Sequence, residues 1–121
     1  AIALGFETAL LMNKSFLFTQ RKDSEMIIRS GFDITKMQKV VIVEDVLTTG
    51  ASIKEVITCA ANNGLEVVAI GVLVDRSGGI IEFSAPLESL LCLEIPAYNK
   101  EDCDACKQGI PLHTPGSSDK I

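Results

Sequence analysis

The segment 40–52 constrains the fold of this chain more than any other stretch. It reads V-V-I-V-E-D-V-L-T-T-G-A-S, and its four leading apolar β-branched residues predict a strand buried on both faces, as in a parallel sheet covered by helices. Glu44 and Asp45 follow where that strand should end. Because ligands of open α/β sheets bind beyond the carboxyl ends of the strands, we expect a binding site here.

A helix is predicted to follow the strand directly. Ser52-x-x-Glu55 has the pattern of a capping box, and apolar residues at helical spacing continue toward Gly64. A helix start near Ser52 would offer unpaired backbone N–H groups, and the hydroxyls of residues 48, 49 and 52 would add donors. Phosphate fits such a site. Carboxylates beside it would face sugar hydroxyls or a Mg²⁺ ion, so the expected ligand is a phosphorylated sugar.

The residues 41–52, V-I-V-E-D-V-L-T-T-G-A-S, resemble the 5-phosphoribosyl-1-pyrophosphate (PRPP) signature of the type I phosphoribosyltransferases. The resemblance implies an α/β fold with a parallel, Rossmann-like sheet over residues 1–121, with a further strand and a base-covering region ahead of residue 1. It also implies that Asp45 is catalytic. The PRPP-binding residues that it implies are Glu44, Asp45, Val46, Leu47, Thr48, Thr49, Gly50, Ala51 and Ser52. The alternative is a buried strand and a capped helix with solvated carboxylates.

The segment 20–31, Q-R-K-D-S-E-M-I-I-R-S-G, is polar and basic, and its Asp-Ser pair is a turn candidate. It predicts a loop or short hairpin that is mobile without ligand, because it has few apolar residues to pack on the sheet. The segment resembles the loop of orotate phosphoribosyltransferases that opens with Arg-Lys and engages pyrophosphate, often that of the neighbouring subunit. Arg21 and Lys22 match that opening, which implies catalytic and PRPP-binding roles. A solvated surface hairpin is the alternative.

A second apolar run, residues 66–74, predicts another buried parallel strand and therefore a βαβ unit. Arg76 follows at the expected ligand edge, and a guanidinium suits a carboxylate or a planar imide. Orotate phosphoribosyltransferases have an orotate-contacting Arg after an Asp at this point, so the resemblance implies orotate binding by Arg76 and Thr48. Arg76 could instead pair with Asp75 or Glu82.

The remaining segments predict a helix over residues 1–13, a short strand over 15–19 and a last edge strand over 90–95. The tail, residues 98–121, is rich in Pro and Gly and is expected to be irregular. Cys103 and Cys106 have the spacing of half a zinc site, with His113 as the one nearby further ligand. We expect all four cysteines to be reduced thiols and not a disulfide framework, because the chain lacks secretory features.

The formal net charge of −5, from 11 basic and 16 acidic residues, argues against a nucleic-acid or membrane-surface binder. The chain begins without Met, so we expect it to be a piece of a longer chain. Neither a signal peptide nor a membrane span is evident, and we expect a cytoplasmic protein.

The resemblance implies the activity of the orotate phosphoribosyltransferases, which convert PRPP and orotate to orotidine 5′-monophosphate and pyrophosphate. The resemblance implies Mg²⁺ bound mainly through PRPP, with no metal-ligating residue assigned in the chain. It also implies a homodimer in which the loop 20–31 is shared across subunits. The alternatives are a phosphoribosyltransferase for another base, or a PRPP-binding regulatory protein without catalysis.

Overall fold

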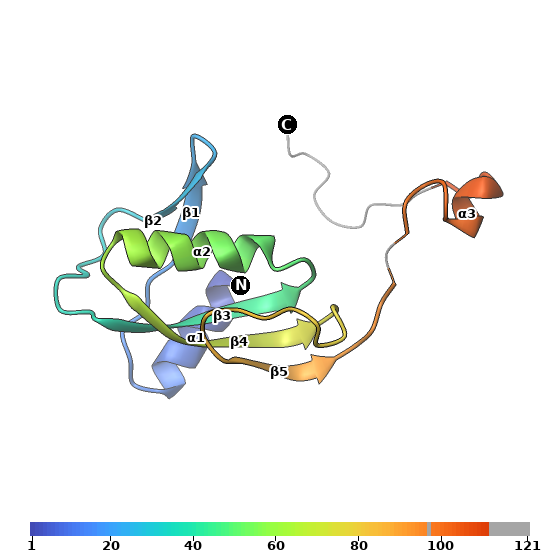
Figure 1. Cartoon of the computed structure of the whole chain (residues 1–121). Coiled ribbons are helices and arrows are strands. Elements are labelled where there is room, and N and C mark those ends of the chain that lie inside the picture. The colour runs from blue at the N-terminus through green and yellow to red at the C-terminus, as the bar shows by residue number, and fades with distance from the viewer. Residues whose placement is uncertain (97, 112–121) are drawn as a thin grey trace.

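The computed structural model describes residues 1–96 and 98–111. Its elements in chain order are α1 (Ile2–Leu11), β1 (Thr19–Lys22), β2 (Glu25–Ile28), β3 (Lys39–Leu47), α2 (Ala51–Asn62), β4 (Glu66–Asp75), β5 (Leu87–Cys92) and α3 (Asp104–Lys107). Figure 1 shows a central sheet, with α2 above it and α1 behind and below it. The chain therefore has the layered α/β architecture that its sequence predicts.

The central sheet has the strand order β3-β4-β5, and both neighbouring pairs are parallel. The chain passes from β3 through α2 to β4, which is the predicted βαβ unit. Leu47 pairs in register with Asp75, and Asp75 pairs with Cys92, so the carboxyl ends of all three strands meet at one edge. The segment 40–52, in which the sequence predicts a binding site, reaches this edge at the end of β3.

The hydrophobic core lies between the sheet and α2. Its buried residues come from β3, from the loop before β5, from α2 and from β4; they are Ile42, Leu47, Ile53, Ile70, Val72 and Ala85. Val56 and Ile57 of α2 pack against this cluster, as their helical spacing predicts. The core therefore holds α2 directly behind the end of β3.

The prediction that residues 40–43 are buried on both faces is wrong for Val41, which is 50% exposed. Leu73 of β4, in the second predicted buried run, is 38% exposed. The register pairs Val41 with Ala69, which places Val41 and Leu73 on the same face of the sheet. Helix α2 covers the opposite face, and among the described residues α1 packs chiefly against β3, so this face is only partly covered.

The strand predicted over residues 15–19 does not form; the strand begins at Thr19 instead. No described strand pairs with residues 15–18, and an extended segment becomes a strand only through a ladder of backbone hydrogen bonds. Its phenylalanines enter an aromatic cluster instead. Phe16 lies 5.7 Å from Phe6, and Phe18 lies 5.4 Å from Phe32, measured between ring centroids.

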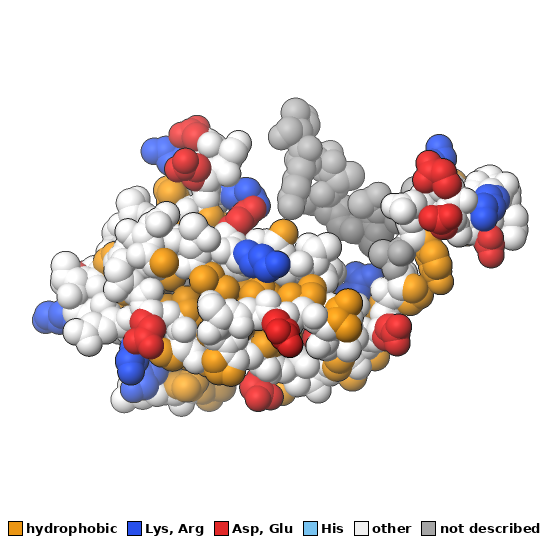
Figure 2. All heavy atoms as spheres, viewed as in Figure 1, with side chains coloured by type: hydrophobic (Ala, Val, Ile, Leu, Met, Phe, Trp, Pro, Cys, Tyr) orange, Lys and Arg blue, Asp and Glu red, His pale blue; other side chains and the backbone are white. Residues whose placement is uncertain are grey.

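The segment 20–31 forms an antiparallel hairpin of β1 and β2. Asp23 and Ser24 both have positive φ, at 50° and 70°, as a two-residue type I′ turn requires. The expectation of few apolar anchors is wrong at the base of the hairpin, because Met26, Ile27 and Ile28 are half-buried and β2 packs against α2. The tip is exposed, and basic and acidic side chains gather there in Figure 2.

The last strand of the sheet is β5, which forms the predicted edge but starts three residues earlier than expected and ends at Cys92. Beyond it, α3 forms one helical turn inside the tail that we expected to be irregular. Cys103 caps this turn, because its Sγ accepts a hydrogen bond from the Cys106 N–H at 3.3 Å. None of the helices in the described residues has the length and apolar composition needed to cross a membrane.

Candidate functional site

A hollow of about 180 Å³ lies at the carboxyl end of β3, where the chain turns into α2. One continuous segment lines it: Glu44, Asp45, Val46, Leu47, Thr48, Thr49, Gly50, Ala51, Ser52 and Ile53. The structure thus brings nine of the eleven residues predicted for PRPP binding around one cavity, and the other two, Arg21 and Lys22, do not line it.

The turn 48–52, which we call the phosphate loop after its predicted ligand, is fixed at three points. Leu47 and Ile53, which flank it, are 1% and 2% exposed, and Gly50 in its centre is also buried. The side chains of Thr48, Thr49, Ala51 and Ser52 are exposed. The loop therefore turns its hydroxyl groups outward while its middle rests on the protein.

The capping-box prediction is wrong. Helix α2 begins at Ala51 and its N-cap is Gly50, at φ 75°, with no side-chain cap. Thr49 Oγ1 accepts a long hydrogen bond of 3.4 Å from the Ala51 N–H, whereas Glu55 forms an ion pair with Arg21. The left-handed Gly50 takes the N-cap position two residues before Ser52, and apart from the long bond of Ala51 the N–H groups of the first turn stay available to an anion.

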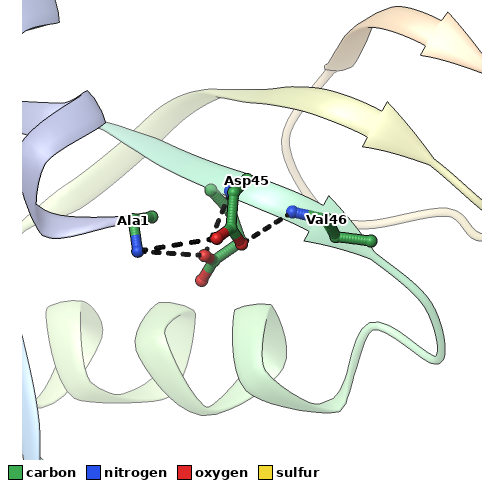
Figure 3. Close-up of polar contacts among 4 residues, drawn as sticks. Ala1, Asp45 and Val46 are labelled. Carbon is green, nitrogen blue, oxygen red and sulfur yellow. Dashed lines mark hydrogen bonds and ion pairs between the residues drawn. The ribbon is translucent and has the colours of Figure 1, made fainter. Parts of the chain in front are cut away.

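Asp45 lies beside the nitrogen of Ala1 in Figure 3, and Glu44 approaches the same atom. The Ala1 amine nitrogen lies 3.9 Å from Glu44 Oε1 and 3.9 Å from Asp45 Oδ2. The two carboxylates therefore face one common position beside the end of β3. The Glu44 side chain is 26% exposed and that of Asp45 is 59% exposed, so both are accessible to a ligand.

The two carboxyl groups differ in acidity. Burial raises the pKa of Glu44 above its usual value. The hydrogen bond from the Glu44 side chain lowers the pKa of Asp45, and the bond from the Val46 N–H, at 2.8 Å, acts in the same direction. Glu44 is therefore the group of the pair that takes up a proton first as the pH falls.

The two basic side chains predicted to contact pyrophosphate lie outside the hollow. Neither Arg21 nor Lys22 lines it, although both are exposed on β1. Arg21 pairs with Glu55 of α2, and Arg29 donates a 2.9 Å hydrogen bond to Gln20. The hairpin therefore places its first cation over the helix that begins at the phosphate loop.

Arg76 lies at the same sheet edge, next to the end of β3. Its backbone N–H donates to the Leu47 carbonyl at 2.8 Å, and its side chain is exposed. Asp75 is 2% exposed and accepts a 2.7 Å hydrogen bond from the Ser77 N–H. Neither of the suggested partners, Asp75 or Glu82, forms an ion pair with Arg76 within residues 1–96, so the guanidinium is available to a ligand.

Sequence reasoning missed two residues that support the site. A Cβ built on Gly50 would lie 3.0 Å from Phe83 Cζ and 3.2 Å from Ile81 Cγ2, so both side chains pack against the Gly50 backbone. The signal available was the alternation of Ile81, Phe83 and Ala85 with polar residues in the connection between β4 and β5. That signal indicates burial but does not name the contact.

The donor set at the hollow fits a cation held jointly with a ligand. Two carboxylates converge there, but in the part of the chain that the structure describes no three His, Cys, Asp or Glu side chains group around a metal position. Cys103 and Cys106 lie together at α3 as free thiols. His113, the further ligand considered for a zinc site, lies outside the described residues.

Comparison with known proteins identifies the family. The phosphoribosyl transferase domain matches residues 7–104, which include the whole sheet, α2 and the phosphate loop. The chain belongs to the phosphoribosyl transferase domain family. The match covers both the α/β core and the loop after β3, where the sequence resembles the PRPP signature.

Several relatives within this family are named orotate phosphoribosyltransferase. The one from Caldanaerobacter subterraneus subsp. tengcongensis is 48% identical over 116 residues, which cover 96% of this chain and 61% of the relative. Those from Thermotoga maritima and Caldicellulosiruptor bescii are 46% and 43% identical, and the matches cover 62% and 63% of their lengths. The chain therefore spans about three fifths of the length of these curated relatives.

Proposed function

We propose that the protein is an orotate phosphoribosyltransferase of pyrimidine nucleotide biosynthesis. In this reaction N1 of orotate loses its proton, which is released with pyrophosphate, and forms a bond to C1 of the ribose ring. The bond from C1 to the pyrophosphate oxygen breaks, and its electron pair leaves with pyrophosphate. The product is orotidine 5′-monophosphate. The relatives named for this activity, at 43–48% identity, support the choice of orotate.

The observation that carries the proposal is the phosphate loop at the start of α2. The N–H groups of the first turn and the exposed hydroxyls of Thr48, Thr49 and Ser52 would hold the 5-phosphate, because a helix N-terminus favours an anion. Gly50 and Ala51 carry no bulk that would keep the phosphate from the backbone.

Glu44 and Asp45 would accept hydrogen bonds from the ribose 2- and 3-hydroxyls, since they converge beside the phosphate loop. Mg²⁺, bound mainly through PRPP, would neutralise pyrophosphate charge when present. A ribosyl transfer of this kind develops positive charge on the sugar ring, so the two carboxylates would also stabilise the transition state.

Arg21 and Lys22 would contact the departing pyrophosphate, and Arg76, with Thr48, would contact orotate. Arg76 suits this role because a guanidinium binds a carboxylate through two parallel hydrogen bonds. In our proposal two chains form a homodimer, and the hairpin of each chain completes the site of its partner.

The activity is tested by incubating the intact protein with PRPP, Mg²⁺ and a panel of orotate, uracil, adenine and hypoxanthine, and measuring pyrophosphate release. We expect pyrophosphate release with orotate and with none of the other three bases. Release with a different base would show that this base, and not orotate, is the substrate. PRPP binding without release for any base would favour a regulatory protein.

Glu44→Gln and Asp45→Asn are each expected to weaken PRPP binding by about tenfold or more, since a hydrogen bond to a charged group contributes about 1.5–3 kcal/mol. The fold should persist, because both side chains lie at a strand end outside the core. Calorimetric titration with PRPP measures the affinity. Glu66→Gln, at the opposite end of the sheet, is the matched control and should bind normally. Unchanged affinity in both site variants would exclude the ribose role.

PRPP affinity is also expected to depend on pH through Glu44. Because the pKa of Glu44 is raised, the carboxylate form is present above that pKa and is lost as the pH falls through it. Affinity should therefore fall on acidification, beginning above the usual range of a Glu side chain. The ligand phosphates titrate as well, so the same titration on Glu44→Gln serves as the control. If both proteins show the same pH profile, Glu44 does not contribute.

A further inference from the structure

The segment between β4 and β5 reaches back to the phosphate loop. Phe83 and Ile81 of this segment press on the centre of the loop: their Cζ and Cγ2 atoms would lie 3.0 Å and 3.2 Å from a Cβ on Gly50. Both side chains are half-buried and pack against the core that contains Leu47 and Ile53. The loop is thus supported at its two ends by the core and at its centre by these two side chains.

Phe83 and Ile81 do not line the hollow at the phosphate loop. They line a separate cavity of about 370 Å³ behind it, together with Asp75. The two side chains therefore lie outside the lining of the hollow, and the Gly50 backbone is their direct contact with the phosphate loop.

Backbone N–H groups bind an oxyanion only when they point at it, so the position of the loop determines the affinity. Gly50 has no side chain of its own to pack, and its φ of 75° is one that few residues adopt. The outer side chains of the loop are exposed and give it no lateral support. The centre of the loop is therefore restrained from two sides: the Gly50 carbonyl accepts a 3.0 Å hydrogen bond from the Lys54 N–H, and Phe83 and Ile81 pack against the Gly50 backbone.

We propose that Phe83, assisted by Ile81, is a positioning residue that sets the phosphate loop in its binding conformation. This inference rests on the proposed function, because it takes the ligand to be PRPP. Phe83 lies seven residues beyond Arg76 on the connection that would also contact the base. One segment would therefore support the phosphate site and carry the base-binding guanidinium.

The test compares Phe83→Ala, Phe83→Leu and the control Phe32→Ala in the intact protein. Phe32 is also half-buried and aromatic, but it packs on Phe18, in the aromatic cluster. PRPP affinity is measured by calorimetry at a temperature where circular dichroism shows every variant folded. Hydrogen exchange of the backbone amides in residues 47–53 is measured without ligand.

Phe83→Ala is expected to weaken PRPP binding by about tenfold to a hundredfold, because a displacement of about 1 Å has effects of that size. Exchange in residues 47–53 should become faster, and Phe83→Leu should restore most of both properties. Phe32→Ala should change neither. Unchanged affinity and exchange in Phe83→Ala, or equal changes in Phe32→Ala, would overturn the positioning role. A wild-type protein that did not bind PRPP would overturn the proposed function instead.

Discussion

Gly50→Val is expected to be among the most damaging substitutions in this chain. The left-handed φ of 75° strains any side chain, by about 1–3 kcal/mol. The new Cβ would also lie 3.0 Å from Phe83 Cζ, and overpacking of this kind costs about 1–3 kcal/mol more. The loop would move or the protein would unfold, and either result removes PRPP binding. Thermal denaturation and calorimetry measure the two effects.

Gly64 offers a matched control for this prediction. Its φ of 73° is nearly that of Gly50, yet a Cβ built there meets nothing within 4 Å. Gly64→Ala therefore reports backbone strain alone, whereas Gly50→Ala reports strain together with the contact to Phe83 and Ile81. We expect Gly50→Ala to lose more thermal stability than Gly64→Ala. We expect PRPP affinity to fall in Gly50→Ala and to stay unchanged in Gly64→Ala. Equal effects of the two alanine variants would show that the contact behind Gly50 is unimportant.

The βαβ unit could be predicted because its signals are local. The apolar runs of β3 and β4 and the helical spacing of α2 each lie within a dozen residues, and the parallel sheet follows from their order. The placement of the carboxylates at the ligand edge then follows from the direction of β3. The site was thus predictable to the extent that it is one continuous segment.

The errors occurred where distant contacts compete with local signals. Ser52-x-x-Glu55 has the letters of a capping box, but Arg21 in the hairpin takes Glu55, and Gly50 starts the helix instead. The same holds for Phe16, whose ring packs in an aromatic cluster when no described strand pairs with its backbone. Side-chain pattern alone did not reveal which alternative is favoured.

Support for the phosphate loop was not predictable for a related reason. Phe83 and Gly50 are far apart in sequence, and their contact depends on how the connection between β4 and β5 folds over the end of β3. Likewise, the coverage of Val41 depends on what packs on that face of the sheet. Neither property belongs to a single segment.

The hairpin has two parts with different expected behaviour. Its base is held by β2 against α2, and its tip, residues 22–25, is exposed. Arg21 stands between them and pairs with Glu55 at a partly exposed site, where an ion pair contributes little, typically below about 1 kcal/mol. A polyphosphate could therefore draw Arg21 from Glu55 without disturbing the base.

Mixing two inactive variants is expected to restore activity if the hairpin completes the site of a partner. One chain carries Arg21→Ala/Lys22→Ala and the other carries Arg76→Ala; each alone should be nearly inactive. In a mixed dimer one site combines the intact hairpin of one chain with the intact Arg76 of the other. After random exchange in a two-fold symmetric dimer, about a quarter of all sites should be active. Pyrophosphate release after subunit exchange measures the recovery.

The control is a mixture of Arg21→Ala/Lys22→Ala with a chain that carries all three substitutions, Arg21→Ala, Lys22→Ala and Arg76→Ala. No arrangement of that mixture contains an intact hairpin, so it should stay inactive. Light scattering must show dimers in every sample. If dimers form and the first mixture gains nothing over its parents, the hairpin acts within its own chain. Arg21 would then reach the pyrophosphate from the position above α2 that it already occupies.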